Sequence, residues 1–279
     1  MPVLKDFIRL IKTPFSLDNY YKSLNLSLKR INNEYTMLHF PFYGNPNDDF
    51  LQAQKNLTDY CISLLGPISG KNILEIGCGN GIQLIYILNR YKPLYATGID
   101  INPINISIAN EEKKEWKLEN IHFEVNNSQD LQGILNNSFD LIICIESAFH
   151  YLDKQSFLNE VQRVLKPDGK FLVADLLFSR KKITLISKFF KKKMRLYNWT
   201  YEKYIEAFNI SGLKILSTSD ITNQVIRGFQ NYPVWLSQIK NKNSLNNVGY
   251  SIFYKVILGI FIYLLKNRRI YEVFIGEKN

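Results

Sequence analysis

Short apolar runs alternate with helical stretches between residues 71 and 177. The runs are rich in β-branched residues, which predicts the strands of a parallel sheet built from βαβ units. We place five strands at Asn72–Ile76, Leu94–Asp100, Ile121–Asn126, Phe139–Glu146 and Lys170–Leu177. Between them, apolar residues recur every three or four positions, as on one face of a helix. These residues are Ile82, Ile85 and Leu88, then Ile104, Ile108 and Ala109, then Phe157, Val161, Val164 and Leu165. A turn is predicted at 166–169, where Lys-Pro-Asp-Gly ends the third helix.

Further elements flank this region. The pattern predicts a helix at Thr200–Asn209, a sixth strand at Leu213–Ile221 and a last strand at Ile270–Gly276. The segment before the last strand is too long for an ordinary loop and is rich in aromatic residues, so we expect a helical cap that closes an apolar pocket together with residues 1–50. We therefore predict one domain, 1–279, made of an N-terminal helical segment (1–66), a Rossmann-like core (67–222), a helical cap insertion (223–268) and the last strand (269–279).

Composition and charge narrow the class of protein. The chain is 46% hydrophobic and 14% aromatic, and its formal net charge is +10. The basic residues form no single stripe, so we interpret them as a solvated face and expect no nucleic-acid partner; contact with anionic lipid is the alternative. The stretch Tyr250–Leu265 contains Lys255 and is shorter than the roughly 20 residues of a membrane span. With no signal-peptide pattern, a cytoplasmic location is expected, with peripheral membrane contact as the alternative.

The cysteines predict neither a disulfide framework nor a metal site. Cys61, Cys78 and Cys144 are odd in number and lack the paired CxxC spacing of zinc ligands. We therefore expect no metal ion in the site.

A glycine-rich segment, Glu75-Ile-Gly77-Cys-Gly79-Asn-Gly81, joins the first predicted strand to the first helix. Glycines let the backbone turn tightly and approach a ligand, and the amides at a helix N-terminus attract a negative group. Asp100 ends the second strand 23 residues after Gly77, where a carboxylate can accept hydrogen bonds from two ribose hydroxyls. The glycines at 77, 79 and 81 differ from the GxGxxG spacing of dinucleotide-binding folds. The segment predicts a nucleoside cofactor, and the spacing disfavours a nicotinamide dinucleotide.

The glycine segment resembles motif I, E/D-x-G-x-G-x-G, of class I (Rossmann-like) S-adenosylmethionine-dependent methyltransferases, in their small-molecule branch. Residues 125–131 with 138–140, and Leu-Lys-Pro-Asp-Gly at 165–169, resemble later motifs of that family, as does the Tyr43-Gly44 pair. Asn127 stands where the family usually has Asp. The resemblance implies a seven-stranded, mostly parallel sheet with helices on both faces and an antiparallel last strand, and S-adenosylmethionine as the cofactor.

The same resemblance assigns roles to individual residues. The glycines shape the methionine site, Glu75 supports their loop, and Asp100 binds the ribose. Ser128 and Gln129 flank the adenine, and Tyr43 closes over the sulfonium, where an aromatic face beside a cation is favourable. The predicted cofactor-binding set is Tyr43, Glu75, Gly77, Cys78, Gly79, Gly81, Asp100, Ile101, Ser128, Gln129 and Glu146.

A second motif, Glu146-Ser-Ala-Phe-His150-Tyr151, follows the fourth predicted strand. Ligands of open α/β sheets bind beyond the carboxyl ends of strands, so this tip should face the acceptor. The segment resembles the E-x-x-x-H pattern of natural-product O- and C-methyltransferases. An imidazole accepts a proton near neutral pH, so we predict His150 as the general base, with a merely structural His150 as the alternative. His39 is interpreted as structural or adjacent to the cofactor.

These features favour methyl transfer from S-adenosylmethionine to a small, largely apolar acceptor, with hydroxyl O-methylation preferred over C- or N-methylation. The DNA-methylating pattern D/N-P-P-aromatic is replaced by Ile-Glu-Ser-Ala at 145–148, which argues against nucleic-acid substrates. Two alternatives stay open. One is a phospholipid or fatty-acyl methyltransferase, or a cyclopropane-forming relative, at a membrane surface. The other is a non-catalytic, cofactor-binding partner subunit that keeps the glycine motif.

Overall fold

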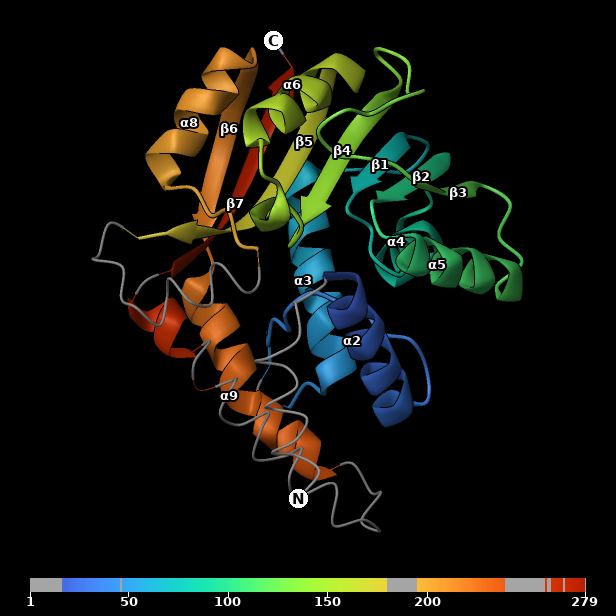
Figure 1. Cartoon of the computed structure of the whole chain (residues 1–279), viewed down its shortest axis with the longest axis vertical. Coiled ribbons are helices and arrows are strands. Elements are labelled where there is room, and N and C mark those ends of the chain that lie inside the picture. Colours follow the sequence, from blue (N-terminus) through green and yellow to red (C-terminus); the bar gives the residue numbers. More distant parts are fainter. Residues whose placement is uncertain are drawn as a thin grey trace.

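The computed structural model describes residues 17–45, 47–179, 195–238, 259, 262–267 and 269–278. These residues form a three-layer α/β arrangement in which one central sheet lies between two layers of helices (Figure 1). The predicted cap helix over Tyr250–Leu265 falls mostly outside the described residues, as does the basic run 180–194.

Seven strands form one sheet in the order β3-β2-β1-β4-β5-β7-β6 (Figure 1). The pairs among β1 to β5 are parallel, whereas β7 lies antiparallel between β5 and β6. This confirms the predicted Rossmann-like sheet and its antiparallel last strand. The bounds are β1 Asn72–Ile76, β2 Tyr95–Asp100, β3 Ile121–Val125, β4 Phe139–Ile145, β5 Leu165–Phe178, β6 Leu213–Asp220 and β7 Arg269–Lys278. The strand order reverses between β1 and β4, and α/β folds bind ligands at the carboxyl ends of the strands at such a point.

Helices cover both faces of the sheet because alternate strand residues feed two separate apolar clusters. One cluster joins the sheet to α3, α4, α5 and α9, and the other joins it to α6 and α8. The bounds are α2 Leu17–Asn32, α3 Phe50–Leu65, α4 Ile82–Tyr91, α5 Pro103–Glu115, the 3-10 turn η1 Ala148–His150, α6 Lys154–Val164, α8 Tyr201–Ile210 and α9 Thr222–Gln238. Four of the helices begin at a side chain that accepts a hydrogen bond from a first-turn amide; these caps are Asp49, Asn102, Asp153 and Thr200.

The turn predicted at 166–169 lies inside the bounds of β5. Leu165 pairs with Phe139 of β4, and the next registered pair is Lys170 with Leu141, so the pairing shifts across these four residues. Asp168 adopts a positive φ of 58° within this irregularity. The Pro-Asp-Gly sequence therefore bends the strand at its start instead of separating it from α6, because Leu165 already pairs with β4 before the bend.

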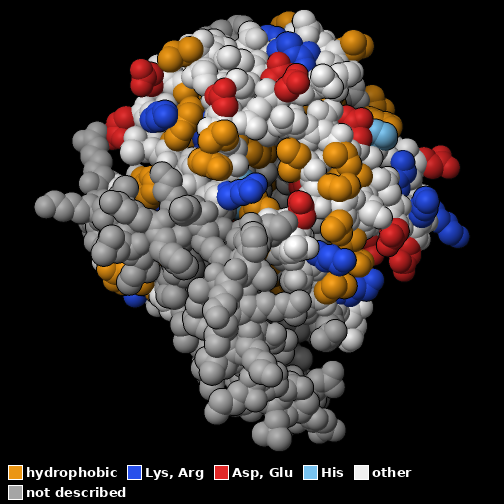
Figure 2. All heavy atoms as spheres, in the orientation of Figure 1, with side chains coloured by type: hydrophobic (Ala, Val, Ile, Leu, Met, Phe, Trp, Pro, Cys, Tyr) orange, Lys and Arg blue, Asp and Glu red, His pale blue; other side chains and the backbone are white. Residues whose placement is uncertain are grey.

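Figure 2 shows Lys and Arg side chains interspersed with Asp and Glu over the coloured part of one face. Within the described ranges, none of the helices is long and apolar enough to cross a membrane. The same described ranges contain no group of three or more His, Cys, Asp or Glu side chains that could hold a metal ion. The three cysteines are unpaired and buried.

Candidate cofactor and acceptor site

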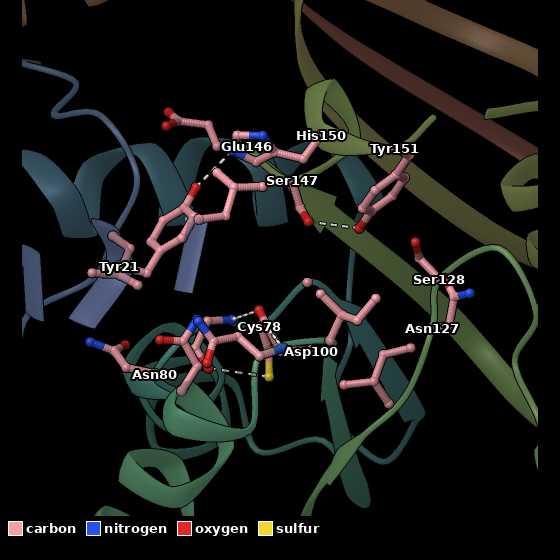
Figure 3. A pocket seen from close by; sticks show the side chains of 18 of the residues that line it. Tyr21, Cys78, Asn80, Asp100, Asn127, Ser128, Glu146, Ser147, His150 and Tyr151 are labelled. Carbon is pink, nitrogen blue, oxygen red and sulfur yellow. Dashed lines mark hydrogen bonds between the residues drawn. The ribbon is translucent and has the colours of Figure 1, made fainter. Parts of the chain in front are cut away.

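A cavity of about 730 Å³ lies at the carboxyl ends of β1, β2, β3 and β4. Figure 3 shows its walls: the loop after β1 with Cys78 and Asn80, Asp100 after β2, Ser128 after β3, and the β4 tip with Ser147, His150 and Tyr151. Helix α2 contributes Leu17, Asp18 and Tyr21, and the segment Met37–His39 adds a further side. The volume lies within the range of about 300–1,000 Å³ that is typical of small-molecule sites.

The glycine loop is shaped by close packing. Gly77 has a φ of 77°, and a Cβ atom on it would overlap the Ser147 side chain at the β4 tip. Gly81 has a φ of 78°, and its Cβ would lie 2.6 Å from Cβ of Ala109 on α5. Only glycine adopts these angles without strain and leaves room for these neighbours. The glycines therefore hold the loop against β4 and α5, and Gly81 acts through packing because it does not line the cavity.

Asp100 ends β2 and faces the cavity with its carboxyl group already oriented. Its Oδ2 accepts a hydrogen bond from Gly79 N at 2.9 Å, and its Oδ1 accepts one from Asn102 N at 2.8 Å. Burial raises the pKa of Asp100 above its ordinary value, although these amides and the Asn105 side chain oppose that shift. Each oxygen of a carboxylate accepts more than one donor, so Asp100 can also accept hydrogen bonds from two ligand hydroxyls.

The loop after β3 forms another wall of the cavity. Asn127 Oδ1 accepts a hydrogen bond from Gln129 N at 3.1 Å, and Gln129 Oε1 accepts one from Asp153 N at 2.6 Å. Ser128 is buried between them, while Ile101, which also lines the cavity, is exposed. The Asn127 side chain thus stabilises the conformation of its own loop.

On the opposite wall, His150 contacts Tyr21 from helix α2 (Figure 3). Nε2 of His150 lies 2.9 Å from the Tyr21 hydroxyl, and Nδ1 lies 3.3 Å from the carbonyl oxygen of Arg195. A carbonyl only accepts, so in the neutral imidazole Nδ1 carries the proton and Nε2 accepts from the Tyr21 hydroxyl. Burial and nearby carboxylates raise the pKa of Tyr21 well above its ordinary value, so it is a neutral phenol. The Tyr21 hydroxyl thus donates its hydrogen bond to His150, and its oxygen can still accept one from a group in the cavity.

Glu146 follows β4 with a φ of 55° and also lines the cavity. Its Oε1 accepts hydrogen bonds from Phe40 N at 2.8 Å and from the Tyr271 hydroxyl at 3.0 Å. Burial nevertheless raises the pKa of Glu146 to about 8. At neutral pH this side chain is therefore mostly a protonated acid, and it is held in place by donors from two distant segments.

We expect Glu146→Gln to remove a pH-dependent loss of stability. A carboxyl whose folded pKa is raised from 4.5 to about 8 stabilises the fold below pH 4.5. That contribution is lost as the pH rises through 8, because the buried group must ionise. Between pH 6 and pH 9 the wild type should lose about 3 kcal/mol that the variant keeps. Thermal unfolding across this range measures the difference.

The control for this experiment is Glu119→Gln, which replaces an exposed glutamate. The gap between the melting temperatures of Glu146→Gln and the wild type should widen with pH, whereas the gap for Glu119→Gln should stay constant. Other raised carboxyls such as Glu272, with a pKa of about 7, titrate in every variant and cancel in the comparison. A constant gap for Glu146→Gln would show that Glu146 is ionised throughout.

The structure brings most of the predicted residues to one cavity. Gly77, Cys78, Gly79, Asp100, Ile101, Ser128, Gln129, Glu146 and His150 line it. Tyr43, Glu75 and Gly81 do not. Tyr43 is buried elsewhere, where burial and the nearby Asp48 and Asp49 raise its pKa to about 12. Glu75 is buried beneath the loop, and burial raises its pKa well above the ordinary value.

His39 lines the cavity as a buried structural side chain. Its Nδ1 lies 3.0 Å from Phe40 O and its Nε2 lies 3.2 Å from Thr58 Oγ1. Burial lowers the pKa of His39 to about 4, so the ring is neutral at physiological pH. These contacts fix the segment that carries Met37 and Leu38 to helix α3.

The cavity also contains residues that sequence reasoning missed, chiefly Tyr21 and Asp18 on α2 and Arg195 and Tyr197 after β5. They belong to no motif: Tyr21 and Asp18 precede the core in sequence, and Arg195 and Tyr197 lie in the connection between β5 and α8. Most of the expected cap, 223–268, lies outside the described residues, and none of its described residues lines the cavity. The N-terminal segment, by contrast, does line it.

The family model for a methyltransferase domain matches residues 68–245, which include the glycine loop, Asp100, the 126–129 loop and His150. This chain belongs to the methyltransferase-domain family. The match covers the cavity walls after β1, β2, β3 and β4, whereas the walls formed by α2 and by Met37–His39 lie outside it.

Two relatives in this family resemble parts of the chain. The phthiotriol/phenolphthiotriol dimycocerosates methyltransferase of Mycobacterium leprae (strain TN) is 33% identical over 161 residues, which cover 58% of this chain and 51% of that protein. The fatty-acid O-methyltransferase of Mycolicibacterium smegmatis (strain ATCC 700084 / mc(2)155) is 33% identical over 131 residues, which cover 45% and 46% of the two chains. These matches span about half of each relative.

A solved structure extends the likeness of the fold to nearly the whole chain. The [4+2]-cyclase SpnF matches with a TM-score of 0.77 over 95% of this chain and 97% of its own, at 18% sequence identity. The likeness shows a shared fold. Since that protein is named as a cyclase, the fold alone does not set the reaction, and the residues of the site must do so.

Proposed function

We propose that this protein transfers a methyl group from S-adenosylmethionine to a hydroxyl of a small, largely apolar acceptor. The observation that carries the proposal is the position of the Tyr21–His150 pair, which faces the glycine loop and Asp100 across one cavity (Figure 3). One half of the cavity offers a nucleoside site, and the other offers a proton acceptor.

The residues present fit such a cofactor. Asp100 can accept hydrogen bonds from ribose hydroxyls, and the 126–129 loop lies on the wall where an adenine would contact the protein. A buried polar atom on the cavity wall in this half, Asn102 Nδ2, has no hydrogen-bond partner within the described residues. Buried polar groups are normally paired, so an unpartnered atom here agrees with a polar ligand or its bound water. When bound, the cofactor supplies an electrophilic methyl group on sulfur.

The acceptor's proton has a route through this chain's own residues. The Tyr21 oxygen can accept a hydrogen bond from the acceptor hydroxyl while its own hydrogen points to His150 Nε2. The acceptor's proton would pass to the Tyr21 oxygen while the Tyr21 proton passes to His150 Nε2. The hydroxyl oxygen could then take up the methyl group that the bound cofactor would supply as its bond to sulfur breaks. His150 thus acts as the base through Tyr21 and becomes an imidazolium that Arg195 O stabilises through Nδ1.

The acceptor class rests on the cavity lining and on the relatives. Apolar side chains line the cavity near α2 and the β4 tip; they are Leu17, Met37, Leu38, Ile145 and Leu152. One relative is named for a fatty acid and the other for phthiotriol dimycocerosates. Both observations support an apolar acceptor with few polar groups. Turnover measured on fatty acids, long-chain alcohols and sterols, with the product mass recorded, tests the acceptor class and separates an enzyme from a non-catalytic subunit.

We expect Asp100→Ala to weaken S-adenosylmethionine binding by about 1–3 kcal/mol, or roughly 5- to 150-fold, because the ribose hydroxyls and the Gly79 amide lose their acceptor. Titration calorimetry on the purified chain measures this. The matched control is Asp140→Ala. It removes a carboxyl near the amino end of β4, at the opposite end of the strands from the cavity, where it accepts a hydrogen bond from Asn72 N. Tight binding of NADH and no heat with S-adenosylmethionine would contradict the proposed function.

A further inference from the structure

A buried ladder of asparagine amides connects helix α2 to two cofactor-site segments. Asn25 Nδ2 donates to Asn105 Oδ1 at 3.0 Å, and Asn80 Nδ2 donates to Asn25 Oδ1 at 2.8 Å. Asn80 belongs to the glycine loop, and Asn105 lies in the first turn of α5, five residues after Asp100. Asn25, Asn80 and Asn105 are each at most 2% exposed. One side chain of α2 thus contacts both the glycine loop and the first turn of α5, which follows Asp100.

The ladder continues to the groups that would contact the cofactor. The Asn105 side chain hydrogen-bonds the Asp100 carboxyl. On the other side, Asn80 Nδ2 also donates to Thr36 O at 2.8 Å, just before the cavity-lining Met37 and Leu38. A displacement of the glycine loop, or of the start of α5 whose Asn105 contacts Asp100, therefore breaks a hydrogen bond to Asn25.

Helix α2 packs outside the two main cores. Its described apolar contacts belong to a small cluster of Leu28 and Phe50 with three half-buried leucines, which is separate from the two main cores. Its polar attachments include the Tyr21–His150 hydrogen bond and the ladder. Asn25 lies one turn after Tyr21, and its Nδ2 also donates to Tyr21 O at 3.0 Å. The Asn25 side chain, which contacts the glycine loop and α5, therefore also fixes the turn of α2 that carries Tyr21.

We propose that Asn25 is a positioning residue that couples the placement of Tyr21 against His150 to the arrangement of the cofactor-binding loops. This inference rests on the proposed function, because it takes those loops to bind S-adenosylmethionine. Buried amides are costly to leave unpaired, so the three asparagines favour one joint arrangement. A ligand that orders the glycine loop and Asp100 then also favours the docked state of α2, and Tyr21 reaches His150 when the cofactor half is filled.

Hydrogen exchange of α2 with and without S-adenosylhomocysteine tests this coupling. In the wild type, a saturating concentration of this probe should slow the exchange of amides in 17–32 by about tenfold or more. In Asn25→Leu, α2 should exchange about tenfold faster without the probe, and the probe should slow it by less than about threefold although calorimetry shows it bound. The matched control is Asn32→Leu on the same helix, since Asn32 Nδ2 donates only to its own helix at Leu28 O. It should behave as the wild type.

Two results would overturn the inference, and they differ in what else they overturn. If α2 of Asn25→Leu still responds to the bound probe as the wild type does, the ladder does not couple the sites, and the proposed function stands. If the wild type does not bind S-adenosylhomocysteine, the proposed function fails and this inference fails with it. Should Asn25→Leu not fold, Asn105→Leu breaks the ladder from α5 and must show the same loss of response.

Discussion

Replacing His150 by glutamine is expected to lower turnover by about 10²-fold or more, the usual scale for the loss of a general base. Glutamine keeps a hydrogen-bonding side chain next to the Tyr21 hydroxyl but cannot take up its proton. Cofactor affinity should change by less than about threefold, because His150 lies on the wall opposite Asp100. The experiment pairs initial-rate kinetics on the best acceptor with calorimetry using S-adenosylhomocysteine.

Tyr21→Phe provides the second half of this experiment. If the proton passes through the Tyr21 hydroxyl, removing that oxygen should cost about as much turnover as removing the imidazole. The double variant should then be no slower than either single one, because the two groups act as one unit. His122→Gln, which changes an exposed histidine on β3, is the matched control. Full activity of Tyr21→Phe together with a slow His150→Gln would place His150 in direct contact with the acceptor.

Replacing Lys154 by methionine is expected to produce the largest loss of stability, about 3–5 kcal/mol in the free energy of unfolding. Lys154 and Asp175 are both fully buried, with Nζ 3.7 Å from Oδ2. Asp175 also accepts hydrogen bonds from the Tyr204 hydroxyl and from Leu176 N. Without Lys154, the carboxylate stays buried with the Tyr204 and Leu176 donors and the charge of Arg269, and breaking a buried pair by removing one partner is strongly destabilising. Urea unfolding at pH 7 measures the effect.

The double variant Lys154→Met with Asp175→Asn separates the charge effect from packing. Asparagine keeps an acceptor for Tyr204 and Leu176 but carries no charge, so the double variant should be more stable than Lys154→Met alone. Destabilisation below about 1 kcal/mol in Lys154→Met would show that Asp175 is already neutral in the folded protein. The pair also contacts the cavity wall, because Lys154 Nζ donates to the carbonyl oxygen of the cavity-lining Tyr197 at 2.6 Å.

That hydrogen bond links the buried pair to the site. Tyr197 N donates to Phe149 O, and Arg195, two residues earlier, accepts from His150 Nδ1. Lys154 therefore holds the segment 195–197 against η1 and fixes the orientation of the His150 ring. No motif in the sequence distinguishes Lys154 from the other lysines, since it occupies the first position of an ordinary amphipathic helix.

The sheet and most residues of the cavity's cofactor half could be predicted from local patterns in the sequence. Period-two and period-three-to-four patterns fix strands and helices locally, because each element must bury one apolar face. Local features also allowed us to predict the glycines at 77, 79 and 81 and the carboxylate at 100. A tight strand-to-helix turn and a strand-end acid are local features that need specific residue types at fixed spacing.

The residues on the opposite wall of the cavity could not be predicted, because long-range packing brings them together. Tyr21 and His150 are 129 residues apart, and Asn25 and Asn80 are 55 apart. Their pairing depends on how α2 packs across the loops at the carboxyl ends of the strands, which no local pattern encodes. The same holds for Tyr43, which the family resemblance placed over the cofactor and which is buried outside the cavity beside Asp48 and Asp49. The protonation state of Glu146 also depends on the fold. Burial raises its pKa to about 8, and the sequence does not show that this side chain is buried.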